Sequence, residues 1–134
     1  MKVLVDTSIW SAALRRSKGP ETFSVQELRA LILEHRVEMI GPIRQEILSG
    51  IRDERQFVRL EKSLEPFPDF PINSEDYVAA ARFFNMCRGR GVQSSNTDFL
   101  ICAVAVRHKL EIFSTDNDFL LFAKHIPIKL HKIR

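Results

Sequence analysis

The N-terminal stretch Lys2-Val3-Leu4-Val5-Asp6-Thr7-Ser8 constrains the fold of this chain more than any other part of the sequence. Three consecutive apolar residues, two of them β-branched, are typical of a short strand that is buried on both faces. Asp6 follows this strand directly, and a helical pattern begins at Ser8 and extends to about Arg16. In open α/β sheets, ligands bind beyond the carboxyl ends of the strands. The first acid of the chain therefore lies where such folds carry out their chemistry.

Further strand patterns alternate with helical patterns along the whole chain. Strands are predicted at Val37–Ile40, at Glu111–Thr115 and at the C-terminal end, where residues 127–133 alternate between apolar and polar side chains and should place His131 outward. Residues 99–106 are almost all apolar, which is typical of a buried central helix. The alternation predicts an α/β fold with a parallel sheet that is covered by helices on both faces. The length of 134 residues fits a single domain spanning residues 1–134.

Two helix starts carry recognisable capping signals. Ser24 and Glu27 have the spacing of a capping box, which predicts that a helix begins at this serine. Ser74 is expected to cap a second helix, with acidic residues in its first turn.

Composition indicates a soluble globular protein. Apolar residues make up 45% and charged residues 28% of the chain, and no apolar run approaches the length of a membrane span. There is no pattern of a secretory signal, so we expect a cytoplasmic protein without a membrane partner. Cys87 and Cys102 both fall in apolar helical patterns and are expected to be buried, reduced thiols. The net charge of +3 does not by itself indicate a nucleic-acid partner.

Four acids are expected to meet at one edge of the predicted sheet. Asp6 and Asp116 each follow a strand, Asp98 lies in the first turn of the buried helix, and Glu46 lies near the start of a helix that follows a strand. Carboxylates gathered in one place repel one another, which raises some of their pKa values unless a cation is present. Ligand sets made only of oxygen atoms favour Mg²⁺ or Mn²⁺ over zinc. Such ions activate water for attack on a phosphodiester.

This joint pattern resembles the PIN domain family of metal-dependent ribonucleases, and within it the small VapC-type toxins of toxin–antitoxin pairs. The resemblance is carried by four segments and covers essentially the whole chain: Val5-Asp6-Thr7-Ser8, Ile43-Arg44-Gln45-Glu46-Ile47-Leu48, Thr97-Asp98-Phe99-Leu100-Ile101-Cys102-Ala103 and Ser114-Thr115-Asp116-Asn117-Asp118-Phe119.

The resemblance implies a three-layer α/β fold with a central parallel sheet of about five strands flanked by helices. It also implies specific roles for these residues. Asp6, Glu46, Asp98 and Asp116 would hold Mg²⁺ or Mn²⁺ directly or through water, and these four would be the catalytic residues. Thr7, Ser8, Thr115 and Asp118 would orient ligands or waters around them. The resemblance also implies an RNA substrate, a homodimer, and a complex with a cognate antitoxin that covers the site.

Basic residues near the ends of the elements that carry the acids are candidates to bind RNA phosphates. They are Arg15, Arg16, Lys18, Arg44, Arg88 and Arg90. Two other functions stay open at this point. One is a PIN-like domain that binds or processes RNA without being a toxin. The other is a receiver-like domain that is phosphorylated on an aspartate, although Asp6 has no acidic neighbour in its turn and Lys109 precedes the late strand.

Overall fold

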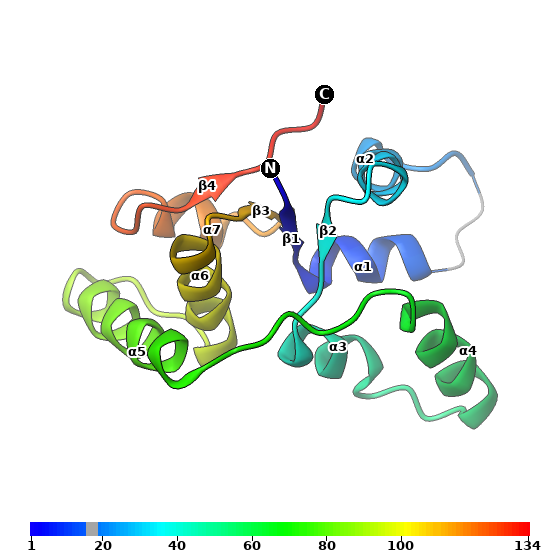
Figure 1. Cartoon of the computed structure of the whole chain (residues 1–134), viewed down its shortest axis with the longest axis horizontal. Coiled ribbons are helices and arrows are strands. Elements are labelled where there is room, and N and C mark those ends of the chain that lie inside the picture. Colours follow the sequence, from blue (N-terminus) through cyan, green and yellow to red (C-terminus); the bar gives the residue numbers. More distant parts are fainter. Residues whose placement is uncertain (16–18) are drawn as a thin grey trace.

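The computed structural model of the chain describes residues 1–15 and 19–134 and confirms the α/β class with a parallel sheet. Its strands are β1 (Val3–Val5), β2 (Val37–Glu38), β3 (Glu111–Phe113) and β4 (Lys129–Leu130). They lie in the order β2-β1-β3-β4, and every neighbouring pair is parallel (Figure 1). The described residues thus form a sheet of four strands, where about five were expected.

The connector after the fourth helix shows why no fifth strand forms there. It touches the sheet at one isolated parallel bridge between Met39 and Asp69, where the N–H of Phe70 donates to the carbonyl of Met39 at 2.7 Å. Pro68 and Pro71 flank this bridge and carry no backbone N–H. A ladder of hydrogen bonds cannot extend past them.

Seven helices within the described ranges flank the sheet. They are α1 (Thr7–Leu14), α2 (Phe23–Leu33), α3 (Gly41–Leu48), α4 (Glu54–Leu64), α5 (Ser74–Gly89), α6 (Asn96–His108) and α7 (Asp118–Phe122). In Figure 1, α1 to α4 lie on the β2 side of β1, and α5 to α7 lie on the β3 and β4 side. None of the helices in the described part of the chain has the length and apolar character needed to cross a membrane.

The centre of the core is formed by β1 and α6. All three residues of β1 are fully buried, and the run from Phe99 to Ala105 in α6 is buried too, which confirms the predicted central helix. Cys87 and Cys102 are free and buried, as expected. Because both elements are locked into the core, the acids at their ends are held on a rigid frame.

Two helix starts differ from their predicted positions by one or two residues. Thr22 caps α2, with its hydroxyl accepting from the N–H of Val25, so the predicted capping box at Ser24 is wrong. Asn73, not Ser74, caps α5, in a capping box with Asp76. Each segment offers two capping residues within three positions, Thr22 and Ser24 in one and Asn73 and Ser74 in the other, so the sequence alone does not fix which one is the cap.

The prediction that His131 faces outward is also wrong. Its side chain is buried between Glu27 on α2 and Glu111 on β3, at 2.7 and 2.8 Å from their carboxylate oxygens. Arg134 lies beyond it and reaches Glu27 and Glu34 at α2. The C-terminal segment therefore ties the β3 and β4 side of the sheet to α2 (Figure 1).

Candidate metal centre at the carboxyl edge of the sheet

Asp6 and Asp116 emerge from neighbouring strands on the same edge of the sheet. Asp6 follows β1 and Asp116 follows β3 by three residues, and these strands pair in parallel with Val5 opposite Phe113. The N–H of Asp6 donates to the carbonyl of Phe113 at 2.9 Å, so the two chains are still joined where the acids begin. Asp6 is also the N-terminal cap residue of α1, but its buried carboxylate makes no cap hydrogen bond. That carboxylate is thus left for other contacts.

Asp98 reaches the same edge from the first turn of α6. Ser95 caps this helix by accepting from the N–H of Asp98 at 3.2 Å, and the hydroxyl of Ser94 donates to the Asp98 carboxylate. Burial raises the pKa of the Asp98 carboxyl above its usual range, against the hydrogen bond from Ser94. The negative charges of Asp6, Asp116 and Glu46 raise the same pKa further. In the folded chain, Asp98 therefore interacts electrostatically with the other three acids singled out in the sequence.

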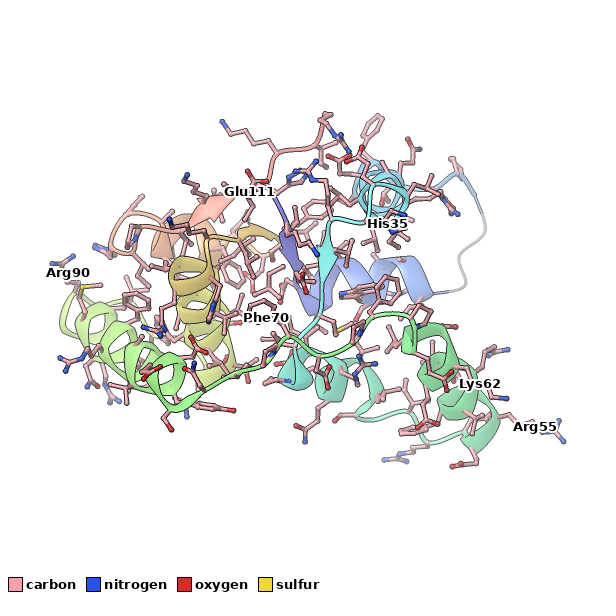
Figure 2. All side chains as sticks on the ribbon, in the orientation of Figure 1. His35, Arg55, Lys62, Phe70, Arg90 and Glu111 are labelled. Atoms are coloured by element: carbon pink, nitrogen blue, oxygen red, sulfur yellow. The ribbon has the colours of Figure 1, made fainter. Side chains whose placement is uncertain are left out.

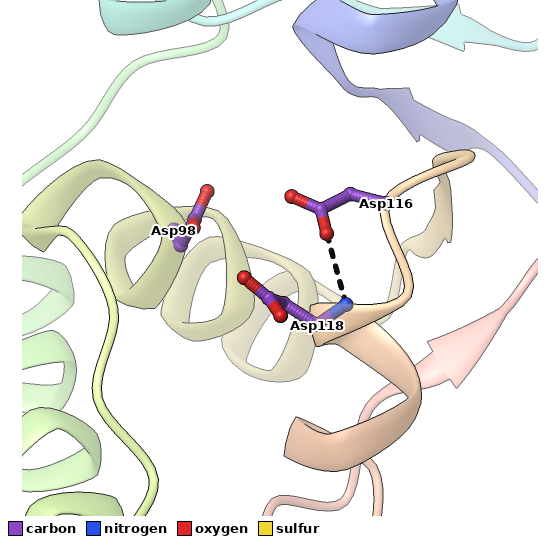
Figure 3. Close-up of side chains that lie close together, drawn as sticks. All are labelled: Asp98, Asp116 and Asp118. Carbon is purple, nitrogen blue, oxygen red and sulfur yellow. Dashed lines mark hydrogen bonds between the residues drawn. The ribbon is translucent and has the colours of Figure 1, made fainter.

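Asp118 lies closer to the centre of the site than its expected supporting role requires. One carboxylate oxygen each from Asp98, Asp116 and Asp118 lie within 4.8 Å of one another (Figure 3). The N–H of Asp118 also donates to Oδ1 of Asp116 at 2.9 Å, which fixes the turn between them (Figure 3). Asp118 can thus offer an oxygen ligand itself, beside Asp98 and Asp116.

Glu46 is held in place by a residue from the first helix. Glu46 lies on α3, whose inward face is fixed by the buried Ile43 and Ile47. The hydroxyl of Thr7 donates to Oε2 of Glu46 at 2.9 Å, which joins α3 to the start of α1 right after Asp6. Thr7 is therefore hydrogen-bonded to the carboxylate of Glu46, a contact that is compatible with the supporting role implied for it.

Two serine hydroxyls surround Asp6, and one of them was missed in the sequence. Ser8 and Ser114 donate to Oδ2 of Asp6 at 3.0 and 2.7 Å. Ser8 was expected near the acids, whereas Ser114 was not singled out. Thr115 contributes its backbone N–H, which donates to the Ser8 hydroxyl at 3.2 Å. The signal for Ser114 was its place directly after β3, where a hydroxyl faces the same edge as Asp116.

The donor set at this edge fits a hard divalent cation. The ligand atoms available are carboxylate oxygens, supported by neutral hydroxyls and backbone N–H groups. Within residues 1–15 and 19–134, no Lys, Arg or His side chain forms an ion pair with Asp6, Glu46, Asp98, Asp116 or Asp118. Converging carboxylates without a countercharge, and without sulfur or imidazole ligands, match the preference of Mg²⁺ and Mn²⁺.

The six basic candidates fall into different environments. Arg44 has a structural role, because its guanidinium donates to Asp69 at 2.9 Å and to the carbonyls of Leu64 and Phe67. Arg15 and Arg88 are exposed, and Arg90, at the outer end of α5, contacts Nδ1 of His125 at 3.1 Å (Figure 2). Arg16 and Lys18 lie outside the residues that the structure describes.

Sequence comparison gives this arrangement a family context. Residues 3–125 match the model of the PIN domain. The chain is 35% identical over 127 residues to the VapC ribonuclease Mb1587 of Mycobacterium bovis and to the ribonuclease VapC11 of Mycobacterium tuberculosis. These alignments cover 91% of this chain and 92% of each relative.

Solved structures share the fold at lower sequence identity. The FitAcB structure from Neisseria gonorrhoeae matches with a TM-score of 0.77 and 22% identity, covering 97% of this chain and 96% of the other. The structure of VapBC2 from Rickettsia felis, bound to a promoter DNA fragment, matches with a TM-score of 0.77 and 17% identity, covering 98% of both chains.

Proposed function

This chain belongs to the PIN domain family, and from that premise we propose that it is a VapC-type ribonuclease, the toxin of a toxin–antitoxin pair. The observation that carries the proposal is that carboxylate oxygens of Asp98, Asp116 and Asp118 lie within 4.8 Å of one another. Asp6 and Glu46 lie near enough for their negative charges to raise the pKa of Asp98, and no ion pair with a cation of the described residues offsets these charges. The similarity to curated VapC ribonucleases over nine-tenths of the chain supports the same reaction. The expected reaction is hydrolysis of an RNA phosphodiester by water.

Each acid has a distinct part in the proposed reaction. Asp98, Asp116 and Asp118 would hold Mg²⁺ or Mn²⁺, and Asp6 would complete the ligand set. Glu46 would bind the ion directly or through a water molecule. The bound ion would activate water and stabilise negative charge on the phosphate. Thr7, Ser8 and Ser114 keep Glu46 and Asp6 in fixed orientations through their hydroxyl hydrogen bonds. No covalent intermediate is expected, since water is the proposed nucleophile and the hydroxyls of Ser8 and Ser114 both donate to Asp6.

RNA binding is proposed to use exposed cations rather than the paired ones. Arg15, Arg88 and Arg90 have no ion-pair partner within the described ranges, whereas Arg44 is committed to the connector. Cations that neutralise phosphates release counterions, so binding should weaken as salt is raised. Replacing Arg88 and Arg90 by Ala should raise KM and flatten that salt dependence while leaving cleavage at saturating RNA nearly unchanged.

We propose that the cognate antitoxin occupies an apolar groove of about 420 Å³ between α1, α2 and the connector after α4. Trp10, Leu28, Ile32 and Phe67 are among its lining residues. Trp10 is buried, and its indole N–H has no hydrogen-bond acceptor among the described residues. Ile32→Arg should prevent co-purification with the antitoxin. Leu33→Arg, on the exposed side of the same helix, is the matched control.

A homodimer is also proposed. Tyr77 and Val78 are both exposed on α5, beside a hollow of about 410 Å³ that is lined in part by Pro42, Ala81 and Leu100. Covering such a surface with a second copy would bury apolar area. Light scattering should show a dimer for the wild-type chain and a monomer for Tyr77→Glu.

The test of the enzymatic proposal is RNA cleavage by the purified chain. Cleavage is expected with Mg²⁺ or Mn²⁺, and it should stop on chelation and in Glu46→Gln. Glu61→Gln, which neutralises an exposed carboxylate on α4, is the control and should cleave normally. Tight RNA binding without cleavage would instead support a non-catalytic PIN-like domain. Labelling of an aspartate by acetyl phosphate would support a receiver-like domain.

A further inference from the structure

Two chains of hydrogen bonds run from Oδ2 of Asp6 into the loop that carries the later acids, and Ser114 is the middle of one of them. In the first chain, the N–H of Asp116 donates to the Ser114 hydroxyl at 2.9 Å, and that hydroxyl donates to Oδ2 of Asp6 at 2.7 Å. In the second chain, the N–H of Thr115 donates to Ser8, whose hydroxyl donates to the same oxygen. Two consecutive N–H groups of one loop are thus tied to one carboxylate oxygen.

The proton count fixes the direction of these bonds. A serine hydroxyl carries one proton, and a backbone N–H can only donate. Ser114 must therefore accept from Asp116 and give its own proton to Asp6, and the same holds for Ser8 and Thr115. Both bonds use Oδ2 of Asp6 as the acceptor. The Ser8 and Ser114 oxygens, 3.3 Å apart, then share the carboxylate rather than bond to each other.

We propose that Ser114 is a positioning residue for the metal centre, acting through Asp6 and Asp116. Its hydroxyl donates a hydrogen bond to Oδ2 of Asp6. No side chain in the described part of the chain donates a hydrogen bond to Oδ1. The carboxylate is therefore turned so that Oδ1 is the oxygen presented to a ligand. Through the Asp116 N–H, the same hydroxyl sets the distance between the β1 acid and the loop that carries Asp116 and Asp118.

Ser114 makes this connection between the two ends of the chain. Asp6 and Ser114 are 108 positions apart, and their bond is the shorter of the two that hold Oδ2. Asp116 then accepts from Asp118 through Oδ1, so the orientation passes on to the start of α7. Hydroxyl groups that hold metal ligands typically change metal affinity by about 10- to 100-fold when they are removed. We expect an effect of this size, which rests on the proposed metal-dependent function.

The test compares two variants of the same shape, Ser114→Thr and Ser114→Val. Thr keeps the hydroxyl and Val replaces it with a methyl group, so packing is matched between them. Each variant is titrated with Mn²⁺ alone in an isothermal titration calorimeter. S114T should bind Mn²⁺ with wild-type affinity, and S114V should bind it about 10- to 100-fold more weakly. In RNA cleavage, S114V should need correspondingly more metal but approach the wild-type rate at saturation.

Two controls distinguish the positioning role of Ser114 from a general effect on stability. Ser49→Ala removes an exposed hydroxyl that bonds only to its own helix, at the Gln45 carbonyl, and should bind Mn²⁺ normally. Equal Mn²⁺ affinity of S114T and S114V would overturn the role of Ser114, even if S114V had a lower melting temperature. If the wild-type chain itself neither bound Mn²⁺ nor cleaved RNA, the proposed function would fail instead.

Discussion

Replacing Asp98 by Asn should make the chain more stable when no metal is present. Asp98 is half-buried in α6, and an oxygen of its carboxylate lies within 4.8 Å of one from Asp116 and one from Asp118. Two unit negative charges at that distance repel by about 3.5 kcal/mol at an effective dielectric constant of about 20, and by about 0.9 kcal/mol in bulk water. Asn has the same shape but no charge, and its side-chain oxygen can still accept from Ser94.

The expected gain lies between these limits, because Asp116 is exposed and its charge is partly screened. We expect about 1 to 2 kcal/mol in the free energy of unfolding, or about 4 to 7 °C in melting temperature for a domain of this length. The wild-type chain and the Asp98→Asn variant should be compared by thermal and urea unfolding in EDTA. Glu61→Gln, an exposed acid on α4, should change neither value.

Adding metal should reverse the order of stabilities. A ligand that binds only the folded state at 100 times its Kd stabilises it by about 2.7 kcal/mol. Wild-type protein should gain that amount with Mn²⁺, whereas D98N, lacking one of the ligands, should gain little. D98N should therefore have the higher melting temperature in EDTA, and the wild-type protein should have the higher melting temperature in Mn²⁺. A D98N variant that melts below wild type in EDTA, or that gains as much from Mn²⁺, would refute the reasoning.

Other predictions concern parts of the molecule away from the metal centre. Asp76→Asn should cost about 2 kcal/mol, because the fully buried carboxylate accepts from Arg107 and His108. Although burial alone would raise it, hydrogen bonds from Asn73, Arg107 and His108 hold the pKa of Asp76 below its usual range. The difference in unfolding free energy between wild type and this variant should therefore be present at neutral pH and vanish as acid protonates Asp76, and a constant difference would contradict it. His131→Ala should lower the urea midpoint by an amount equivalent to about 2 kcal/mol, since it leaves the buried Glu27 short of a partner, whereas Lys132→Ala, in the next exposed position, should be neutral.

The position of much of the candidate site could be predicted because its acids are placed by local rules. A strand followed by an acid, repeated at Asp6 and Asp116, needs only parallel pairing to bring the two side chains to one edge. Asp98 needs only a helix start beside that edge. Each rule depends on a few adjacent residues only, and the parallel pairing of the strands then brings the acids to the same edge.

The residues that were missed depend on contacts between distant parts of the chain. Ser114 is one serine among several in polar turns, and only its bond to Asp6 distinguishes it. Glu27 fits a capping box by spacing, but His131 and Arg134, more than a hundred positions away, bind it instead. Arg44 is an ordinary cation in the sequence until the connector folds over it and presents the carbonyls of Leu64 and Phe67. The spacing of neighbouring residues cannot identify a hydrogen-bond or ion-pair partner that lies far away in the sequence.

The treatment of buried acids in this chain gives the strongest physical reason for a cation at the sheet edge. Where Glu27 and Asp76 are buried, the fold brings an arginine and a histidine to each of them. The sequence is rich enough in basic residues to do the same elsewhere, with 20 lysines and arginines against 17 acids. Yet at the edge where Asp6 is buried and Asp98 half-buried, the described residues supply only hydroxyls and N–H groups. Because uncompensated charge is costly to bury, this contrast among the described residues supports the proposed divalent cation, which would supply positive charge to the carboxylates at this edge.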